Sequence, residues 1–231
     1  MFNINKYLEL IKRLLKAGLK PSINWSKKPT VNTLLLRHDV DFSIDYAHQI
    51  ALHESKLKVY STFFFMLTSN MYNFLSAHNQ KLVKEISNMG HKVSIHFDPT
   101  AYQSQDNFVY EKNIFENLIN IKVDIISIHR PGRFLNNNNI TFSGVPHTYQ
   151  DIYFKKMKYI SDSGGRDVST MILEYLKGSR EYGLHLLIHP IWWVGRLVKV
   201  SNSTKCLNAW RTRYFEFITS EIRKNCKTYD E

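Results

Sequence analysis

Acidic and histidine side chains follow apolar segments at five separate places in this chain. The first apolar segment, NTLLLR at residues 32–37, leads directly into Asp39 and Asp41. Four later segments lead in the same way into polar residues, which are His96 and Asp98, His129 and Arg130, Ser161 and Asp162, and His189. Aspartate and histidine bind Zn²⁺ and similar divalent metals, and they also transfer protons near neutral pH. These residue types therefore predict hydrolysis of an amide or ester with the help of a metal ion.

Each of these residues also has an ordinary structural interpretation. A lone histidine at a strand end is more often a hydrogen-bonded structural residue than a ligand, and Asp41 could cap a helix that begins near Ser43. The functional interpretation therefore depends on aspartate and histidine recurring together at successive strand ends.

Strand-like and helical segments alternate along the chain, and the alternation predicts how distant polar residues meet. Short apolar runs predict strands, and helical spacing predicts helices, at 32–37 (strand), 43–57 (helix), 59–67 (strand), 80–90 (helix), 92–97 (strand), 107–121 (helix), 123–129 (strand), 159–163 (strand), 168–178 (helix), 184–190 (strand) and 206–224 (helix). Such units imply a parallel sheet in an α/β fold, either a small barrel or an open doubly wound sheet. In both folds the carboxyl ends of the strands share one side, so these polar residues can converge.

In this order the motifs resemble those of the polysaccharide deacetylases, carbohydrate esterase family 4, over roughly residues 33–195. The matching segments, in the order of the family's five motifs, are RHDVD (37–41), GHKVSIHFDPT (90–100), HRPGRF (129–134), SDSGG (161–165) and LLIHP, which ends at residue 190. The resemblance implies a distorted (β/α)7 barrel of the polysaccharide deacetylase type. It also implies a carbohydrate deacetylase, which removes an N-acyl or O-acyl group from a sugar.

The resemblance assigns catalytic roles to individual residues. Asp39 would be the catalytic base and Asp41 the first metal ligand, although Val40 between them leaves these two roles open to exchange. Arg130 would orient the base through a charge-assisted hydrogen bond, and His189 would be the general acid.

The second motif departs from the family pattern at Thr100, which stands where the family has a second histidine. His96 matches the first histidine of that motif and would bind the metal. Asp98, His129 and His189 are candidates for the missing ligand, and His129 is favoured because it ends the next strand. The expected cofactor is therefore one divalent metal ion, zinc first and cobalt, nickel or manganese as alternatives, bound by Asp41, His96 and His129.

The last two motifs suggest contacts with a sugar. Trp192 and Trp193 follow His189 at once, and their faces could stack on a sugar ring, with ordinary core packing as the alternative. Asp162 of the fourth motif is also expected to bind the substrate.

Charge and composition restrict the partners of the chain. Lysine and arginine outnumber aspartate and glutamate by 31 to 20, which gives a net charge of +11 and predicts an anionic partner or surface. The basic residues are scattered without a nucleic-acid-binding motif, so no nucleic acid partner is expected. The expected substrate is an acylated sugar, phosphate-bearing or lipid-linked, from the biosynthesis of a surface polysaccharide or glycan.

The chain is expected to contain an amphipathic helix with its lead-in at residues 1–30 and a single α/β barrel domain at residues 31–231. The amino-terminal helix has apolar residues at helical spacing and lysines between them, so it either packs on the domain or contacts an anionic membrane. No secretory signal is recognisable, and Cys206 and Cys226 form no disulfide pattern. These features predict a cytoplasmic protein, with the inner face of the membrane as an alternative location.

Three hypotheses of function follow from the sequence. The first is a metal-dependent deacetylase, the second is a metal-independent relative, and the third is an inactive relative that binds carbohydrate. Thr100 motivates the second and third. Activity that survives chelation would favour the second, and sugar binding that tolerates loss of Asp39 would favour the third.

Overall fold

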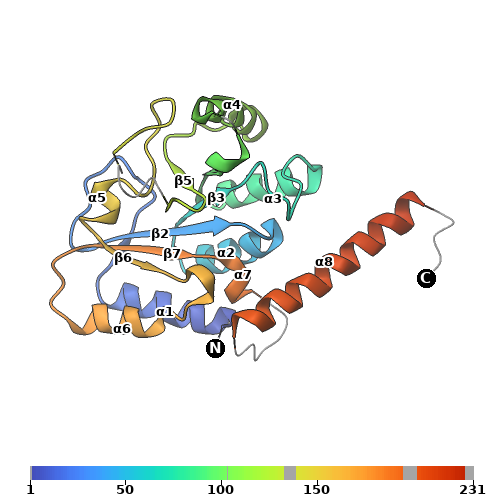
Figure 1. The fold of residues 1–231 in the computed structure, drawn as a ribbon. Helices are drawn as coiled ribbons and strands as arrows, with labels where there is room; N and C mark the ends of the chain where they lie inside the picture. The colour runs from blue at the N-terminus through green and yellow to red at the C-terminus, as the bar shows by residue number, and fades with distance from the viewer. Residues whose placement is uncertain (1, 103, 133–138, 195–201, 227–231) are drawn as a thin grey trace.

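The computed structural model describes residues 2–102, 104–132, 139–194 and 202–226, which form one parallel sheet with helices around it (Figure 1). The strands are β1 (Lys20–Pro21), β2 (Thr33–Val40), β3 (Thr62–Phe65), β4 (Lys92–Phe97), β5 (Ile126–Ile128), β6 (Lys158–Ser161) and β7 (Leu184–Ile188). The helices are α1 (Ile4–Lys16), α2 (Ile44–Lys56), α3 (Ala77–Asn88), α4 (Phe108–Ile119), α5 (Asp151–Phe154), α6 (Ser169–Lys177), α7 (Pro190–Trp193) and α8 (Ser203–Asn225).

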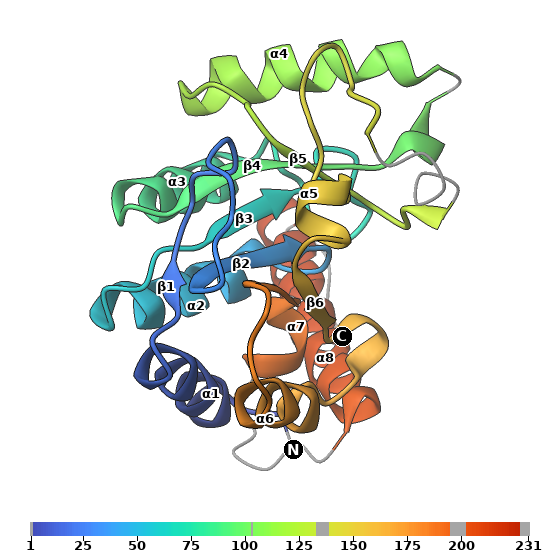
Figure 2. The same cartoon turned by 90° about the vertical axis from the view of Figure 1, so that its left-hand side faces the viewer.

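The strand order identifies an incomplete barrel. The sheet runs β5-β4-β3-β2-β7-β6, with β1 beside β2, and every strand pair is parallel. Neighbours in sequence are thus neighbours in space, and β7 returns to β2 as in a closed ring. Within the described residues no ladder joins β5 to β6, and α5 lies at this open side (Figure 2). The distorted (β/α)7 barrel is therefore confirmed, and the open doubly wound sheet is not observed.

The helices cover the outer face of this curved sheet. Figure 2 shows α4, α3, α2, α1 and α6 following one another around the outside. Side chains on β2 alternate between the two faces, because successive residues of a strand point in opposite directions. Leu34, Leu36 and Val40 join the large outer core, whereas Leu35 joins a smaller inner cluster with Trp25.

The predicted elements are present with small shifts at their ends, with one correction at β2. The first strand was expected to end at Arg37, but β2 continues to Val40 and pairs there with β3, Asp39 opposite Phe64. Asp39 consequently lies inside the barrel and only Asp41 stands at the rim. The three elements missing from the sequence prediction, β1, α5 and α7, have two to four residues each, too few to show a period.

Helix α1 packs on the domain, which was one of the two interpretations of its amphipathic pattern. The side chain of Asn3 caps its first turn, and its apolar face, including Tyr7, Ile11 and Leu14, is buried. The hydroxyl of Tyr7 donates a hydrogen bond to the fully buried carboxylate of Glu54 on α2. The apolar face of α1 is therefore covered by the protein itself, and this helix offers no apolar face to a membrane.

Helix α8 is the exception among the long helices, because it projects away from the sheet and its helical layer (Figure 1). Of its residues only Cys206 is buried. No helix among the described residues is long and apolar enough to span a membrane.

Candidate functional site

Strand alternation brings one set of polar side chains to the inside of the barrel. Arg37 and Asp39 are two residues apart on β2 and therefore point the same way, and Asp41 follows them beyond the end of the strand. His96 on β4 is paired with Ser127 on β5, and His129 follows β5 as His189 follows β7. Because all strands are parallel, these residues meet at the carboxyl ends of the strands, as expected.

Asp41, His96 and His129 form a cluster that fits a metal ion. One potential ligand atom from each lies within 4.8 Å of the other two. Nε2 of His96 is 3.2 Å from Oδ1 of Asp41 and 3.2 Å from Nδ1 of His129. Two ring nitrogens and a carboxylate oxygen that face one point are the donor set of zinc and its neighbours. Of the three candidates for the missing ligand, His129 is the residue that the structure groups with Asp41 and His96.

The other two candidates for the missing ligand, Asp98 and His189, make hydrogen bonds to other residues. The carboxylate of Asp98 accepts hydrogen bonds from the backbone N–H and the hydroxyl of Thr100, at 2.8 and 2.6 Å. Thr100 itself is exposed in a short 3₁₀ turn at Pro99–Ala101. Nδ1 of His189 is 2.6 Å from the carboxylate of Asp162.

The charges around the cluster favour the ionised form of Asp41 and the neutral form of His129, whereas His96 differs: burial lowers its pKa, but Asp39 and Asp41 together raise it. Burial raises the pKa of Asp41, but the imidazoles of His96, His189 and His129 outweigh it and hold that pKa well below its usual range. Burial and the neighbouring His96 lower the pKa of His129, which favours its neutral, metal-binding form.

Asp39 is held by one oxygen and leaves the other without a partner. Oδ2 accepts hydrogen bonds from Nη2 of Arg37 at 3.1 Å and from the hydroxyl of Ser127 at 3.0 Å. Oδ1 is buried and has no hydrogen-bond partner within the described part of the chain. Oδ2 also lies 3.9 Å from Nε2 of His96, so this carboxylate borders the metal cluster and keeps one oxygen free to accept a proton.

The arginine beside Asp39 is Arg37 rather than Arg130. The guanidinium of Arg37 is fully buried, donates hydrogen bonds to Thr148 and, at 2.7 Å, to the hydroxyl of Tyr149, and lies over the Tyr149 ring. Burial lowers the pKa of Arg37, but Asp39, Tyr149 and Tyr159 together outweigh it, so the pKa rises and the group stays charged. Arg130 is exposed, with a positive φ of 49°, and among the described residues no hydrogen bond joins it to Asp39. The last two residues of its motif, at 133–134, lie outside the described residues.

His189 and Asp162 form a second pair at the opposite side of the site. The carboxylate of Asp162 is fully buried and receives hydrogen bonds from the backbone N–H of His189 and from the indole N–H of Trp193. Burial lowers the pKa of His189, but Asp162 outweighs it and raises that pKa to about 9. Nε2 of His189 faces Asp41, 3.8 Å from Oδ2. Asp162 was expected to contact the substrate, whereas the structure places it behind His189.

The two tryptophans lie in the core. Trp193 is 1% exposed, with its ring 5.1 Å from Phe2 and 5.7 Å from Tyr7. Trp192 is 8% exposed and its ring is 6.3 Å from Phe2. Core packing, the alternative interpretation, is therefore what the structure shows, because the amino-terminal segment covers both rings.

Sequence reasoning missed the residues that hold Asp39. Arg37 stands two residues before Asp39, and Ser127 stands two residues before His129. Residues two apart on a strand point to the same face, so Arg37 and Ser127 share a face with residues that had already been singled out. This two-residue spacing was the sequence signal that could have identified Arg37 and Ser127. Tyr149 and Thr148 gave none, because they lie outside regular strands.

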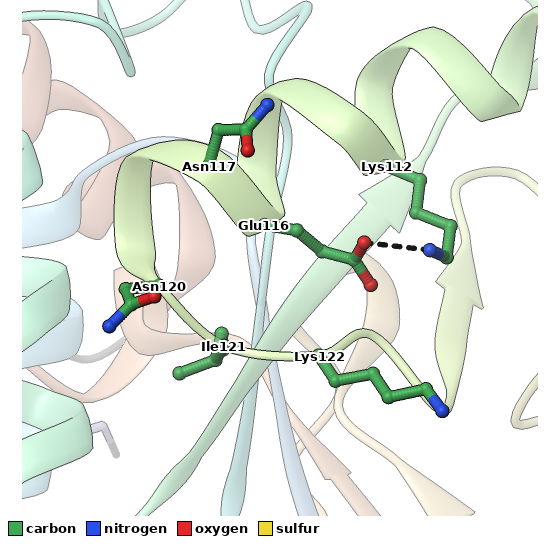
Figure 3. Close-up of a pocket in the computed structure, with 6 residues that line it drawn as sticks. All are labelled: Lys112, Glu116, Asn117, Asn120, Ile121 and Lys122. Atoms are coloured by element: carbon green, nitrogen blue, oxygen red, sulfur yellow. Dashed lines mark hydrogen bonds and ion pairs between the residues drawn. The ribbon is translucent and has the colours of Figure 1, made fainter.

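A separate pocket lies at the carboxyl-terminal half of α4 and the segment that follows it (Figure 3). It has a volume of about 410 Å³ and is lined by Lys112, Glu116, Asn117, Asn120, Ile121 and Lys122. Lys112 and Glu116 form an ion pair across it at 2.7 Å. These residues precede β5, whereas the polar cluster follows the strands, so the pocket and the cluster are distinct.

Comparison with known proteins finds similarity in structure only. The chain matches no family model and no curated protein by sequence. Among solved structures it is similar to the peptidoglycan deacetylase PdaC from Bacillus subtilis, with 11% identity, a TM-score of 0.47, and 85% of this chain and 96% of that chain covered. It is also similar to the peptidoglycan N-acetylglucosamine deacetylase Bc1960, with 16% identity, a TM-score of 0.46, and 91% of each chain covered.

The chain is also similar to structures of a CE4 family pseudoenzyme, in wild-type and mutant forms. Its wild-type form from Bacillus anthracis is 17% identical, with a TM-score of 0.44, and 84% of this chain and 62% of that chain are covered. This chain thus spans less than two thirds of the pseudoenzyme. The predicted resemblance to the CE4 deacetylases is found again in structure, and at these identities it concerns the fold.

Proposed function

We propose that this chain is a divergent polysaccharide deacetylase that hydrolyses an N-acyl group on a sugar with the help of one divalent metal ion. The observation that carries the proposal is the convergence of Asp41, His96 and His129 within 4.8 Å, between Asp39 and His189. A metal-binding cluster flanked by a carboxylate on one side and an imidazole on the other is suited to amide hydrolysis.

The donor set of the cluster fits the metal. Asp41, His96 and His129 would hold it, because one donor atom of each lies within 4.8 Å of the other two. When bound, zinc or a related ion would lower the pKa of a water molecule and stabilise negative charge on the acyl oxygen.

The protein residues supply the proton transfers. Asp39 accepts a proton from the attacking water at Oδ1, while Arg37 and Ser127 keep Oδ2 in place. The water oxygen forms a bond to the acyl carbon, and the bond between that carbon and the sugar nitrogen breaks. His189 donates a proton from Nε2 to the leaving nitrogen, since Asp162 holds its Nδ1 and favours the protonated ring. The products are a carboxylic acid and an amino sugar.

The substrate class rests on two observations. PdaC and Bc1960 are named as deacetylases of peptidoglycan, which supports an acetylated sugar. The net charge of +11 supports a substrate that bears phosphate, such as a nucleotide-linked or lipid-linked sugar of glycan biosynthesis. A cytoplasmic location would suit such an intermediate and belongs to the same proposal.

The metal-independent and inactive alternatives rest on Thr100, and metal analysis of the purified protein separates them from the proposal. We expect near-stoichiometric zinc, cobalt, nickel or manganese in the parent, and its loss in both His96→Ala and His129→Ala. Thr100→Val should keep the metal, because Thr100 is exposed and bonded to Asp98.

The same variants are then assayed for acetate release from N-acetylglucosamine oligosaccharides. Metal and acetate release that disappear together in His129→Ala support the proposal. A parent protein that binds none of the four metals would contradict it. Activity that survives chelation would assign the chain to the metal-independent class.

A further inference from the structure

The first half of the carboxyl-terminal helix α8 contacts the domain through three side chains that the structure describes. Sγ of Cys206 lies 3.4 Å from the backbone oxygen of Trp192. The ring of Trp210 meets that of Phe42 edge to face, with 5.2 Å between the centroids. Arg213 donates a hydrogen bond to the hydroxyl of Tyr46 at 3.0 Å. These contacts anchor α8 beside the candidate site, because Phe42 directly follows Asp41.

The second half of α8, residues 214–225, exposes large apolar side chains. The exposed fraction is 68% for Phe215, 59% for Phe217, 37% for Ile218 and 38% for Ile222. Figure 1 shows this half extending away from the rest of the molecule. Helices of this length are marginal in water without tertiary packing, and clustered exposed apolar groups usually mark an interaction site. The distal half of α8 is thus expected to be covered by a partner.

The width of the apolar face favours a broad, flat partner. At about 100° per residue, Phe215 and Phe217 lie about 160° apart around the helix, with Ile218 and Ile222 between them. A coiled-coil seam is narrower than this, whereas a helix that lies on a membrane buries a wide face. Glu221 also falls within the arc, and its charge is paired with Lys224 at 2.6 Å.

The net charge of the chain favours an anionic surface, whereas the second half of α8 is itself neutral, with Arg223 and Lys224 against Glu216 and Glu221. Helix α8 carries five basic residues (Lys205, Arg211, Arg213, Arg223 and Lys224) and two acidic ones (Glu216 and Glu221). The chain as a whole has a net charge of +11. Two copies of such a chain would repel one another, whereas a bilayer rich in anionic lipid would attract each of them.

We propose that the distal half of α8 binds the surface of a membrane that contains anionic lipid, with Phe215 and Phe217 in the headgroup region. The helix leaves the domain from the rim of the candidate site, and the carboxyl end of β2 points to the same side (Figure 1). This surface contact is independent of the proposed reaction.

Co-sedimentation with lipid vesicles tests the proposal. The full chain should bind vesicles of equimolar phosphatidylcholine and phosphatidylglycerol and should not bind pure phosphatidylcholine. Phe215→Gln with Phe217→Gln should weaken binding to the mixed vesicles about tenfold or more, because apolar burial is lost while a good helix former is kept. The matched control is Tyr110→Gln with Ile114→Gln on α4, whose side chains are 64% and 44% exposed. It should bind as the parent does.

Three outcomes would overturn the proposal. One is the absence of binding to the mixed vesicles, and another is equal weakening by the α4 control. The third is a dimer, seen by sedimentation equilibrium, that dissociates in the Phe215 and Phe217 variant, which would assign the helix face to a second copy. Asp41→Asn should bind vesicles normally even without metal, so failure of the proposed reaction and failure of membrane binding are distinguishable.

Discussion

Arg37 donates a hydrogen bond to Asp39 at 3.1 Å although the two residues belong to the same strand. Both point into the barrel because they are two residues apart, and Thr148 and Tyr149 hold the guanidinium from across the open side. The proposed base is therefore oriented by an arginine of its own strand.

Arg37→Lys tests this arrangement. Lysine keeps the charge but lacks the planar fork that reaches Asp39, Thr148 and Tyr149 together, so we expect kcat/KM to fall about 100-fold. Thermal unfolding of the same variant checks that it folds. Arg130→Lys is the matched control and should change kcat/KM much less, because Arg130 is exposed. If kcat/KM falls more in Arg130→Lys than in Arg37→Lys, Arg130 is the residue that orients the base.

Asp162→Asn should remove the acid function of His189 in a pH-dependent way. Burial lowers the pKa of His189 and the carboxylate of Asp162 raises it to about 9, so without that charge the pKa falls. The imidazole then loses its proton at lower pH, and kcat/KM should drop about 100-fold near pH 8 and less near pH 6. The pH profile of kcat/KM provides the measurement. Asp124→Asn, an exposed aspartate that pairs with Lys92, is the control. An equal loss at every pH would indicate a structural role for Asp162.

Glu111 should make the folded state less stable as pH rises. Burial raises its pKa from 4.5 to about 7, although a hydrogen bond from Tyr102 opposes the shift. Between these values the folded state binds more protons than the unfolded state, so the free energy of unfolding falls with pH, by up to about 3 kcal/mol.

Glu111→Gln, which resembles the protonated acid, should remove this fall. Urea unfolding near pH 5 and near pH 8 measures it, with the exposed Glu181→Gln as control. If the parent and Glu111→Gln lose the same stability between the two pH values, Glu111 does not titrate in this range.

Tyr7→Phe should weaken the attachment of α1. The hydroxyl of Tyr7 donates to Glu54, a fully buried carboxylate that also accepts a hydrogen bond from Ser61 at 2.6 Å. Loss of one donor to a buried carboxylate should cost about 1–3 kcal/mol of unfolding free energy, measured in urea. Tyr110→Phe on the exposed face of α4 should cost less than about 0.5 kcal/mol. A loss of that small size in Tyr7→Phe would mean that this hydrogen bond contributes little to stability.

The sequence by itself determined the alternation of strands and helices and the side of the sheet where polar residues gather. Apolar spacing is a local property, and parallel strands must bring their carboxyl ends to one side, so residues from Asp39 to His189 were expected to converge. The choice of His129 over Asp98 followed from the same reasoning, and the structure groups His129 with Asp41 and His96.

The tertiary structure decided which partners these residues have. Arg37 rather than Arg130 holds Asp39, Asp162 lies behind His189, and the amino-terminal segment buries Trp193. Each of these contacts joins segments that are far apart in the sequence or depends on which face of a strand points inward. The spacing of Arg37 and Asp39 within one strand could have been read from the sequence, whereas the contacts of Asp162 and Trp193 depend on the pairing of β6 with β7 and on the packing of α1, which no spacing within one segment shows.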